Sequence, residues 1–322
     1  MKRGWTAADI PPQTGRIAIV TGTGGLGYET ALELARAGAQ VVLAGRNAAK
    51  GKAAVTLIAD AVPGAQISFA MLDLADLASV RAFADGFLAC HERLDILVNN
   101  AGVMALPTRE LTRDGFEMQL GTNFLGAFVL TAHLLPALRR SDVARTIQLS
   151  SLAHRRGFID FGDLQGEKRY APWKAYSQSK LAMLIFAREL QRRSDMHGWG
   201  LTSLAAHPGW AATELIGNGP ASTTGIMARG ARVVEALLPL LGQSARDGAL
   251  PTLYAATAQD VMKGGYYGPD GFYEVRGAPA PAKATGEATD PAVWSRLWEA
   301  AEALTGQPFA TADESAMAAA TP

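Results

Sequence analysis

Short aliphatic runs alternate with longer segments of helical periodicity along the first two-thirds of this 322-residue chain, and this alternation constrains the fold most. A strand, a covering helix and a second strand form one βαβ unit, and a series of such units builds a parallel sheet. The strand segments are almost continuously hydrophobic, which indicates a sheet buried on both faces. The strands predicted in this way are residues 17–21, 41–44, 67–72, 96–98, 146–149 and 201–205.

Helices are predicted between these strands, where apolar residues recur three and four positions apart. After Pro208 the chain becomes richer in glycine, proline and alanine, with two further helical stretches. The sequence therefore predicts a single α/β domain, with a doubly wound, mainly parallel sheet of about seven strands and helices on both faces. The predicted helices cover residues 25–37, the segment from the second strand through Ile58, and residues 77–90, 115–140, 175–193, 225–241 and 291–304.

The composition excludes several classes of protein. The chain carries 30 basic and 30 acidic residues, a balance that argues against a nucleic-acid-binding surface. Its single cysteine, Cys90, excludes a disulfide framework and a thiolate metal cluster. The histidines lack metal-binding spacing, and we expect each of them at the surface or at a helix end. They are His91, His133, His154, His197 and His207.

The chain shows no sign of a targeting or membrane-spanning segment. No apolar run follows Lys2 and Arg3, so the amino-terminal residues do not read as a signal peptide. We find no stretch of about 18 apolar residues of the kind that spans a membrane. We therefore expect a soluble, cytoplasmic protein without a membrane span, and a frayed tail over residues 311–322.

A glycine-rich turn follows the first strand and opens the first helix. Its sequence places Gly22, Gly24 and Gly27 in the spacing G-x-G-x-x-G. Glycines at such a junction let backbone amides approach a pyrophosphate at the positive end of a helix. In an alternating α/β chain this turn favours dinucleotide binding by a Rossmann-type fold over a merely tight turn.

The end of the second strand distinguishes between the two nicotinamide dinucleotides. An acid there binds the ribose 2′-hydroxyl of NAD, whereas a cation binds the 2′-phosphate of NADP. The strand ends in Gly45-Arg46-Asn47, which contains an arginine and no acid. Arg46 therefore predicts NADP(H) as the cofactor.

Tyr176 and Lys180 lie four residues apart in a predicted helix, so their side chains share one helix face. A free tyrosine titrates near pH ~10. A nearby positive charge favours the phenolate and lowers that pKa. The same spacing is common on solvated helix faces, and it is the glycine turn and the α/β alternation that favour a catalytic pair.

Over residues 14–213 the sequence resembles the short-chain dehydrogenase/reductase family, whose motifs occur here in the expected order. Asn-Asn-Ala-Gly at 99–102 is similar to the segment that closes the family's fourth strand, and Asp73 resembles the acid that hydrogen-bonds the adenine. Pro208-Gly209 with Thr213 resembles the segment that holds the nicotinamide. The family's catalytic tetrad is matched by Asn123, Ser151 (directly after Ser150), Tyr176 and Lys180.

Within the family the sequence is most similar to the retinol-dehydrogenase-like and protochlorophyllide-reductase-like branch. The similarity rests on Trp-Thr-Ala-Ala-Asp-Ile-Pro at 5–11, an insertion at 155–173, and the segments 179–182, 249–257 and 266–269. The glycine turn departs from the family pattern, because Gly22 and Gly25 have two residues between them instead of three. Arg46 is then expected to recognise the 2′-phosphate with less support from the turn.

The resemblance implies an NADP(H)-dependent alcohol dehydrogenase or carbonyl reductase. It makes Tyr176 the general acid/base, gives Ser151 a hydrogen bond to the reacting oxygen, and lets Lys180 hold the nicotinamide ribose while lowering the pKa of Tyr176. It assigns Asn123 to a water-mediated proton relay. The implied cofactor contacts are Gly22, Gly24, Gly25, Leu26, Gly27, Arg46, Asp73, Leu74, Asn99, Ala101, Gly102, Tyr176, Lys180, Pro208, Gly209 and Thr213.

The substrate is expected beyond the carboxyl ends of the strands. Trp210 and Leu215 are the predicted contacts, and residues 215–241 are predicted to form a mobile lid over a fairly bulky, apolar carbonyl or alcohol. The core would then comprise residues 14–213, and the lid and C-terminal helices residues 214–310. A non-catalytic NADP sensor and an NAD-dependent nucleotide-sugar epimerase or dehydratase stay open as alternatives, and so does a homodimer or homotetramer.

Overall fold

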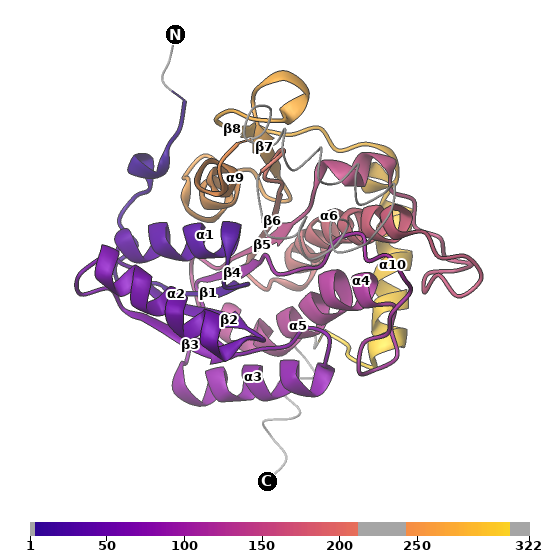
Figure 1. The fold of residues 1–322 in the computed structure, drawn as a ribbon, viewed down its shortest axis with the longest axis horizontal. Helices are drawn as coiled ribbons and strands as arrows, with labels where there is room; N and C mark the ends of the chain where they lie inside the picture. Colours follow the sequence, from indigo (N-terminus) through magenta and orange to yellow (C-terminus); the bar gives the residue numbers. More distant parts are fainter. Residues whose placement is uncertain (1–3, 212–242, 310–322) are drawn as a thin grey trace.

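In the computed structural model, which describes residues 4–211 and 243–309, one sheet has the strand order β3-β2-β1-β4-β5-β6-β7-β8 (Figure 1). All neighbouring strands are parallel except β8, which pairs antiparallel with β7. The strands are β1 (Ile17–Thr21), β2 (Gln40–Gly45), β3 (Ile67–Met71), β4 (Ile96–Asn99), β5 (Arg145–Leu149), β6 (Thr202–Ala206), β7 (Tyr266–Pro269) and β8 (Pro279–Pro281).

The predicted parallel sheet is confirmed, and the six strands located from sequence agree with the structure to within one residue at each end. β7 is the seventh parallel strand. β8 is an additional edge strand that the sequence pattern does not predict, because it contains Pro279 and Pro281. Proline lacks the N–H that a central strand needs, so a strand of this kind occurs at a sheet edge.

Helices cover both faces of the sheet (Figure 1). Alternate residues of β1 face opposite layers: Ile19 packs in the core under α3, α5 and α6, whereas Ala18 and Val20 pack in the core under α1, α2 and α9. The helices are α1 (Gly25–Arg36), α2 (Ala48–Ala61), α3 (Leu77–Cys90), α4 (Met118–Leu120), α5 (Gly126–Leu138), α6 (Pro172–His197), α9 (Ala245–Thr257) and α10 (Pro291–Thr305), with 3-10 turns η1 (Ala7–Asp9), η3 (Leu152–Arg156), η5 (Phe272–Glu274) and η6 (Gly286–Thr289).

Local signals set several helix boundaries. The Asp76 side chain accepts from the backbone N–H groups of Ala78 and Ser79, so α3 begins where the sequence predicts it. α6 begins with Pro172 at its first turn and ends at Gly198, whose left-handed φ of 63° closes the helix.

Helix α9 was not among the predicted helices. It contains Gly248 and Pro251, two residues with poor helix propensity. A Cβ at Gly248 would lie 2.7 Å from the Ala211 Cβ and 2.9 Å from a Leu26 methyl, so the glycine permits close packing of α9 against α1. Here tertiary packing outweighs local propensity.

One segment corrects the expectation that no helix is apolar enough to span a membrane. Among the described residues, Met118–Leu138 passes that test by length and composition, with a mean hydropathy of 1.3, but 89% of the apolar window is buried inside the protein. It comprises α4, the π-helical segment η2 (Gly121–Leu125) and α5. The segment is accounted for as the central core helix.

An aromatic cluster joins the C-terminal helix to the core. Trp298 of α10 lies 5.8 Å from Phe186 of α6 and 5.0 Å from Phe128 of α5, between ring centroids. Phe309 closes this cluster, at 4.4 Å from Trp298 and 4.9 Å from Phe128. Residues from three helices and the last described residue therefore share one packed group.

The chain reverses its direction across the sheet between β1 and β4. From β1 the strands proceed to β2 and β3 on one side, and from β4 onward on the other. At such a switch point the loops after the two strands diverge, and they leave a crevice at the carboxyl ends.

Candidate active site

A cleft of about 1290 Å³ lies at this switch point. Its walls come from the segments that follow the carboxyl ends of the first six strands and from the first turns of α6. The lining includes Thr21–Leu26, Gly45–Asn47, Lys50, Leu72–Leu74, Asn100–Met104, Ser150, Ser151, Arg155, Arg156, Trp173, Tyr176, Lys180, Pro208–Ala211, Tyr273 and Val275.

The glycine turn forms a tight cradle at the start of α1. Gly22 has a φ of 94°, and a Cβ on Gly27 would lie 2.1 Å from the Gly22 carbonyl oxygen. The turn is bound to the segment that follows the neighbouring strand β4, because the Thr21 hydroxyl oxygen accepts from the N–H groups of Asn100 and Ala101 at 2.9 and 3.0 Å. These crowded positions and the N-terminus of α1 fit a dinucleotide pyrophosphate.

Cationic side chains line the cleft beyond β2. Arg46 and Lys50 both lie there, together with Asn47, whose side chain caps α2 by accepting from the Lys50 N–H at 2.9 Å. The cap places Lys50 in the first turn of α2, close to Arg46 in the sequence. Two cations without an intervening acid suit a phosphate-bearing ribose.

Ser151, Tyr176 and Lys180 meet at the other end of the cleft. Ser151 follows β5, and it is the polar side chain whose proximity favours the phenolate of Tyr176. Tyr176 and Lys180 are 5% and 4% exposed, and the Lys180 Nζ lies 5.9 Å from the centre of the Tyr176 ring. The neighbouring Ser150 has a different task, because its hydroxyl donates to the Lys180 carbonyl oxygen at 2.8 Å.

The electrostatics of the protein groups differ from the predicted effect of Lys180 on Tyr176. Burial raises the pKa of Tyr176 to about 12, with only the Ser151 side chain acting against it. Burial also lowers the pKa of Lys180 to about 8. Desolvation disfavours both charged forms. The lowering of the Tyr176 pKa that we predicted from Lys180, with the cationic nicotinamide adding to it, is therefore not seen among the protein groups alone.

Asn123 lies in the π-helical segment η2 beneath the cleft. Its side chain accepts from the Val103 N–H at 2.7 Å and donates to the Val103 carbonyl and to the Ser179 hydroxyl. The Ser179 hydroxyl in turn donates to the Tyr176 carbonyl at 2.8 Å. Asn123 thus fixes the segment after β4 against the helix that carries Tyr176, and π-segments of this kind often mark functional sites.

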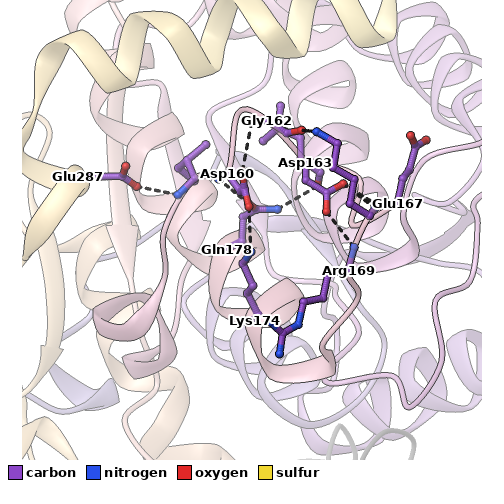
Figure 2. Close-up of polar contacts among 11 residues, drawn as sticks. Asp160, Gly162, Asp163, Glu167, Arg169, Lys174, Gln178 and Glu287 are labelled. Atoms are coloured by element: carbon purple, nitrogen blue, oxygen red, sulfur yellow. Dashed lines mark hydrogen bonds and ion pairs between the residues drawn. The ribbon is translucent and has the colours of Figure 1, made fainter.

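The insertion between Ser151 and Tyr176 is a structured loop clipped to α6. Figure 2 shows Gln178 at its centre: the amide oxygen accepts from the Asp160 N–H at 2.9 Å, and the amide nitrogen donates to the Leu164 carbonyl at 3.0 Å. Asp163 accepts from the backbone N–H groups of residues 167–169, and Glu287 accepts from the Ile159 N–H at 2.7 Å. These contacts position the loop that leads to Trp173, whose ring packs edge-on against Tyr176 at 5.9 Å.

Most of the predicted site residues line this cleft, including Trp210, but Asn99, Gly27 and Asn123 do not. The Asn99 side chain points into the core, where it donates to Thr131 and Gln148, and its neighbour Asn100 lines the cleft instead. Gly27 supports the turn from below. Thr213, Leu215, the predicted helix at 225–241, the lid and the tail lie outside the described residues.

Sequence reasoning missed several lining residues. Asn47, Lys50, Arg155, Trp173 and Tyr273 all contribute to the walls. Lys50, four positions after Arg46 at the start of a helix, was the one that a spacing argument could have found. The others depend on how distant loops fold onto the site.

The expectation that the histidines are surface or capping residues is wrong for two of them. His154 is 1% exposed and His207 is fully buried. Burial lowers the pKa of His154 to about 4, although its Nδ1 lies 2.7 Å from the Ser151 carbonyl oxygen. Among the described residues no group of three metal-ligating side chains occurs.

The fold and the cleft define a nicotinamide-dinucleotide oxidoreductase of the doubly wound class. The chain belongs to the short chain dehydrogenase family, whose family model matches residues 16–222. This match confirms the resemblance inferred from the motifs.

Two relatives extend the similarity over most of the chain. Mouse (Mus musculus) polyprenol dehydrogenase is 43% identical over 303 residues, which are 92% of this chain and 86% of the relative. Human (Homo sapiens) retinol dehydrogenase 13 is 43% identical over 305 residues, which are 93% of this chain and 86% of the relative. These similarities confirm the retinol-dehydrogenase-like branch.

Solved structures show the same fold. The crystal structure of an uncharacterized protein from Mycobacterium paratuberculosis has a TM-score of 0.77 at 41% identity, covering 96% of this chain and 100% of that one. A short chain dehydrogenase from Shigella flexneri, solved in complex with NADP, has a TM-score of 0.58 at 27% identity, covering 76% of this chain and 92% of that one.

Proposed function

We propose that the protein is an NADP(H)-dependent oxidoreductase that interconverts a ketone or aldehyde and the corresponding alcohol, with Tyr176 as the general acid/base. The observation that carries this proposal is that Ser151, Tyr176 and Lys180 all line the same dinucleotide-sized cleft, with Tyr176 and Lys180 on one helix. Two hydroxyls together can bind one carbonyl oxygen and supply it with a proton.

The bound nicotinamide supplies or accepts the hydride. In the reductive direction Ser151 donates a hydrogen bond to the substrate oxygen, and Tyr176 gives its proton to the same oxygen. Lys180, one turn further along α6, holds the ribose of the cofactor. The buried position of Tyr176 excludes water from the proton that it transfers, since its side chain is 5% exposed.

The protein groups alone do not favour ionisation of the Tyr176 phenol, which the oxidative direction requires. Burial raises the pKa of this tyrosine to about 12. In the oxidative direction the cofactor would bring a cationic nicotinamide ring to the site, and a positive charge near the phenol favours the phenolate. The chain therefore holds a protonated tyrosine, which is the form that reduction consumes.

The preference for NADP(H) is proposed on the basis of Arg46 and Lys50, which line the cleft after β2. The NADP complex of the Shigella flexneri enzyme supports a nicotinamide dinucleotide in a related fold. A 2′-phosphate would accept charge-assisted hydrogen bonds from these side chains, whereas NADH lacks that group.

An apolar, fairly bulky substrate is proposed on the basis of the aromatic and aliphatic wall of the cleft. Trp173, Trp210, Tyr273, Val103 and Met104 all contribute to the lining. The names of the relatives, a polyprenol dehydrogenase and retinol dehydrogenases, support an apolar alcohol or its carbonyl form.

A panel of carbonyl compounds tests the proposal directly. Oxidation of NADPH is followed by absorbance with acetone, cyclohexanone, β-ionone and all-trans-retinal, and the Tyr176→Phe variant serves as the control. We expect turnover to rise with apolar size and to vanish in the variant. Turnover of none of these compounds, or equal turnover by the variant, would contradict the proposed reaction.

A further inference from the structure

The loop between β7 and β8 reaches the cleft with one of two adjacent aromatic residues. Tyr273 lines the cleft and Phe272 does not, and the two side chains are 70% and 85% exposed. The two rings pack edge-to-face at 4.4 Å. The loop therefore brings a selected aromatic ring to a site whose other walls come from residues far away in the sequence.

The backbone of this loop adopts an unfavourable conformation at two successive residues. Tyr273 has a φ of 51° and Glu274 a φ of 60°, both in the left-handed region that favours glycine. Residues other than glycine keep such a conformation only where the surrounding structure holds them, and they concentrate at functional sites. The loop needs an anchor.

Glu274 is that anchor. Its Oε2 accepts from Arg155 Nη2 at 2.6 Å and from His207 Nε2 at 2.9 Å, and its Oε1 accepts from the Lys283 N–H at 3.2 Å. The Arg155 and Glu274 side chains are 27% and 16% exposed, and His207 is fully buried. A charge-assisted pair in such a position is stronger and more specific than an exposed one.

The proton on His207 is fixed by its other neighbour. The Gly209 N–H donates to His207 Nδ1 at 3.1 Å, so in the neutral ring the proton lies on Nε2 and points to Glu274. The ring fits against β7 only because residue 268 is glycine, where a Cβ would lie 1.9 Å from His207 Nε2. The Trp210 N–H also donates to the Val275 carbonyl at 2.8 Å.

These contacts join three parts of the cleft at one carboxylate. Arg155 comes from the turn that follows Ser151, His207 directly precedes the Pro208-Gly209 segment, and Tyr273 is the residue next to Glu274. A residue that only stabilised the fold would not need to link the serine side, the nicotinamide side and the aromatic wall of the cleft.

We propose that Tyr273 contacts the substrate and selects for ring-bearing apolar compounds, and that Glu274 is a positioning residue that holds Tyr273 in place through Arg155 and His207. The inference rests on the proposed function, because it names the residue that recognises the substrate of that reaction. Tyr273 offers an aromatic face and a phenolic hydroxyl, which suit an alicyclic or unsaturated group beside the carbonyl.

The first experiment compares Tyr273→Ala with Phe272→Ala, which removes the adjacent ring that does not line the cleft. Binding of β-ionone to the NADP⁺-saturated enzyme is measured by calorimetry, and kcat/KM is measured for β-ionone and acetone. We expect Tyr273→Ala to weaken binding and kcat/KM for β-ionone by about 10-fold, as for the loss of one aromatic contact, with little change for acetone. Phe272→Ala should stay within about 2-fold of the wild type.

The calorimetric measurement needs no turnover, so it separates two kinds of failure. If the wild type binds β-ionone through Tyr273 but reduces no carbonyl, the proposed reaction fails and the role of Tyr273 stands. Equal effects of the two alanine substitutions, or no β-ionone binding by the wild type, would overturn the role of Tyr273.

The second experiment tests Glu274 as a positioning residue. Glu274→Ala should raise the KM for β-ionone as Tyr273→Ala does, and by a larger factor than it raises the KM for acetone. Glu274→Gln keeps an oxygen that accepts from His207 and should recover part of the loss. In the double variant Tyr273→Ala/Glu274→Ala the KM should be no worse than in Tyr273→Ala alone. Additive effects of the two substitutions, or a uniform fall in kcat for both ketones, would show a merely structural role.

Discussion

Lys180 donates from Nζ to the carbonyl oxygen of Leu149 at 3.0 Å, so the ammonium is bound to the end of β5 instead of to the Tyr176 hydroxyl. The two side chains share a helix face, as their spacing predicts, yet the lysine does not act on the phenol directly. The Lys180 Nζ lies 5.9 Å from the centre of the Tyr176 ring. The position of Lys180 suits a group that binds the cofactor ribose. It would then affect Tyr176 only through the bound cofactor.

Removal of the Tyr176 hydroxyl should separate chemistry from cofactor binding. We expect Tyr176→Phe to abolish hydride transfer and to leave the Kd for NADPH nearly unchanged, because the hydroxyl is aimed at the reacting oxygen. Single-turnover absorbance and NADPH fluorescence titration provide the two readouts. Retention of a tenth of the activity would show that another group donates the proton.

Lys180 should make the stability of the cofactor-free protein depend on pH. Burial lowers its pKa to about 8 from an ordinary value of 10.5, so between these values the unfolded chain binds the proton and the folded chain does not. The free energy of unfolding should therefore rise from pH 8 to pH 10.5, by at most about 3 kcal/mol from this group. Urea unfolding at pH 7.5 and pH 9.5 measures the rise.

Lys180→Met is the matched control for this pH dependence. It removes the titrating group and keeps an unbranched side chain, so it should abolish the rise between pH 8 and pH 10.5. Tyr176 acts with the opposite sign only above pH 10, because its pKa is raised from 10.0 to about 12. A rise of equal size in the variant would assign the effect to another group.

Cofactor preference should depend on the cations after β2. A charge-assisted hydrogen bond contributes about 1.5–3 kcal/mol, so Arg46→Ala should reduce kcat/KM for NADPH by roughly 10- to 150-fold and change that for NADH little. Lys50→Ala should have the same direction. Lys52→Ala is the control, since Lys52 is exposed on the same helix and does not line the cleft.

Converting the enzyme to NADH needs more than an acid in place of Gly45. A Cβ at this position would lie 2.8 Å from the Thr23 methyl, so Gly45→Asp forces that side chain to move. We expect Gly45→Asp/Arg46→Ala to use NADH well only when combined with Thr23→Ser. NADH kinetics of the double and triple variants give the comparison, and equal kcat/KM values for the two would show that Thr23 is no obstacle.

The hydrogen bonds that join the insertion to α6 through Gln178 should contribute to stability. Gln178→Met leaves the Asp160 N–H and the Leu164 carbonyl without this partner, and we expect a loss of about 1–3 kcal/mol in the free energy of unfolding. Lys174→Met is the control: it breaks an exposed ion pair with Asp160 and should change the melting temperature little. Equal losses in thermal unfolding would contradict a special role of Gln178.

The sequence predicts the parts of this fold that local patterns encode. The α3 boundaries agree because Asp76 supplies the cap and the apolar spacing is regular. The buried parallel strands stand out because they are hydrophobic without interruption. Helix α9 and strand β8 were not predicted, because their glycine and proline residues have low helix or strand propensity. Both elements form because of the segments that they pack against.

The candidate site was predictable where motifs carry it and not where tertiary contacts build it. Ser151, Tyr176 and Lys180 follow from motif spacing, and the structure brings them together. The orientation of Asn99 and the burial of His207 could not be read from the chain, because each depends on residues more than thirty positions away. The sign of the pKa shift of Tyr176 likewise depends on burial, which a one-dimensional spacing argument does not include.

The place of Phe309 in the aromatic cluster has a consequence for the order in which the protein matures during synthesis. The ring packs against Trp298 of α10 and Phe128 of α5, beside Phe186 of the helix that carries Tyr176 and Lys180. On the ribosome, the sheet strands and α6 emerge long before residue 309 does. The nascent chain can therefore pair its strands early. The aromatic cluster that packs against α6 becomes complete only after Phe309 has been synthesised.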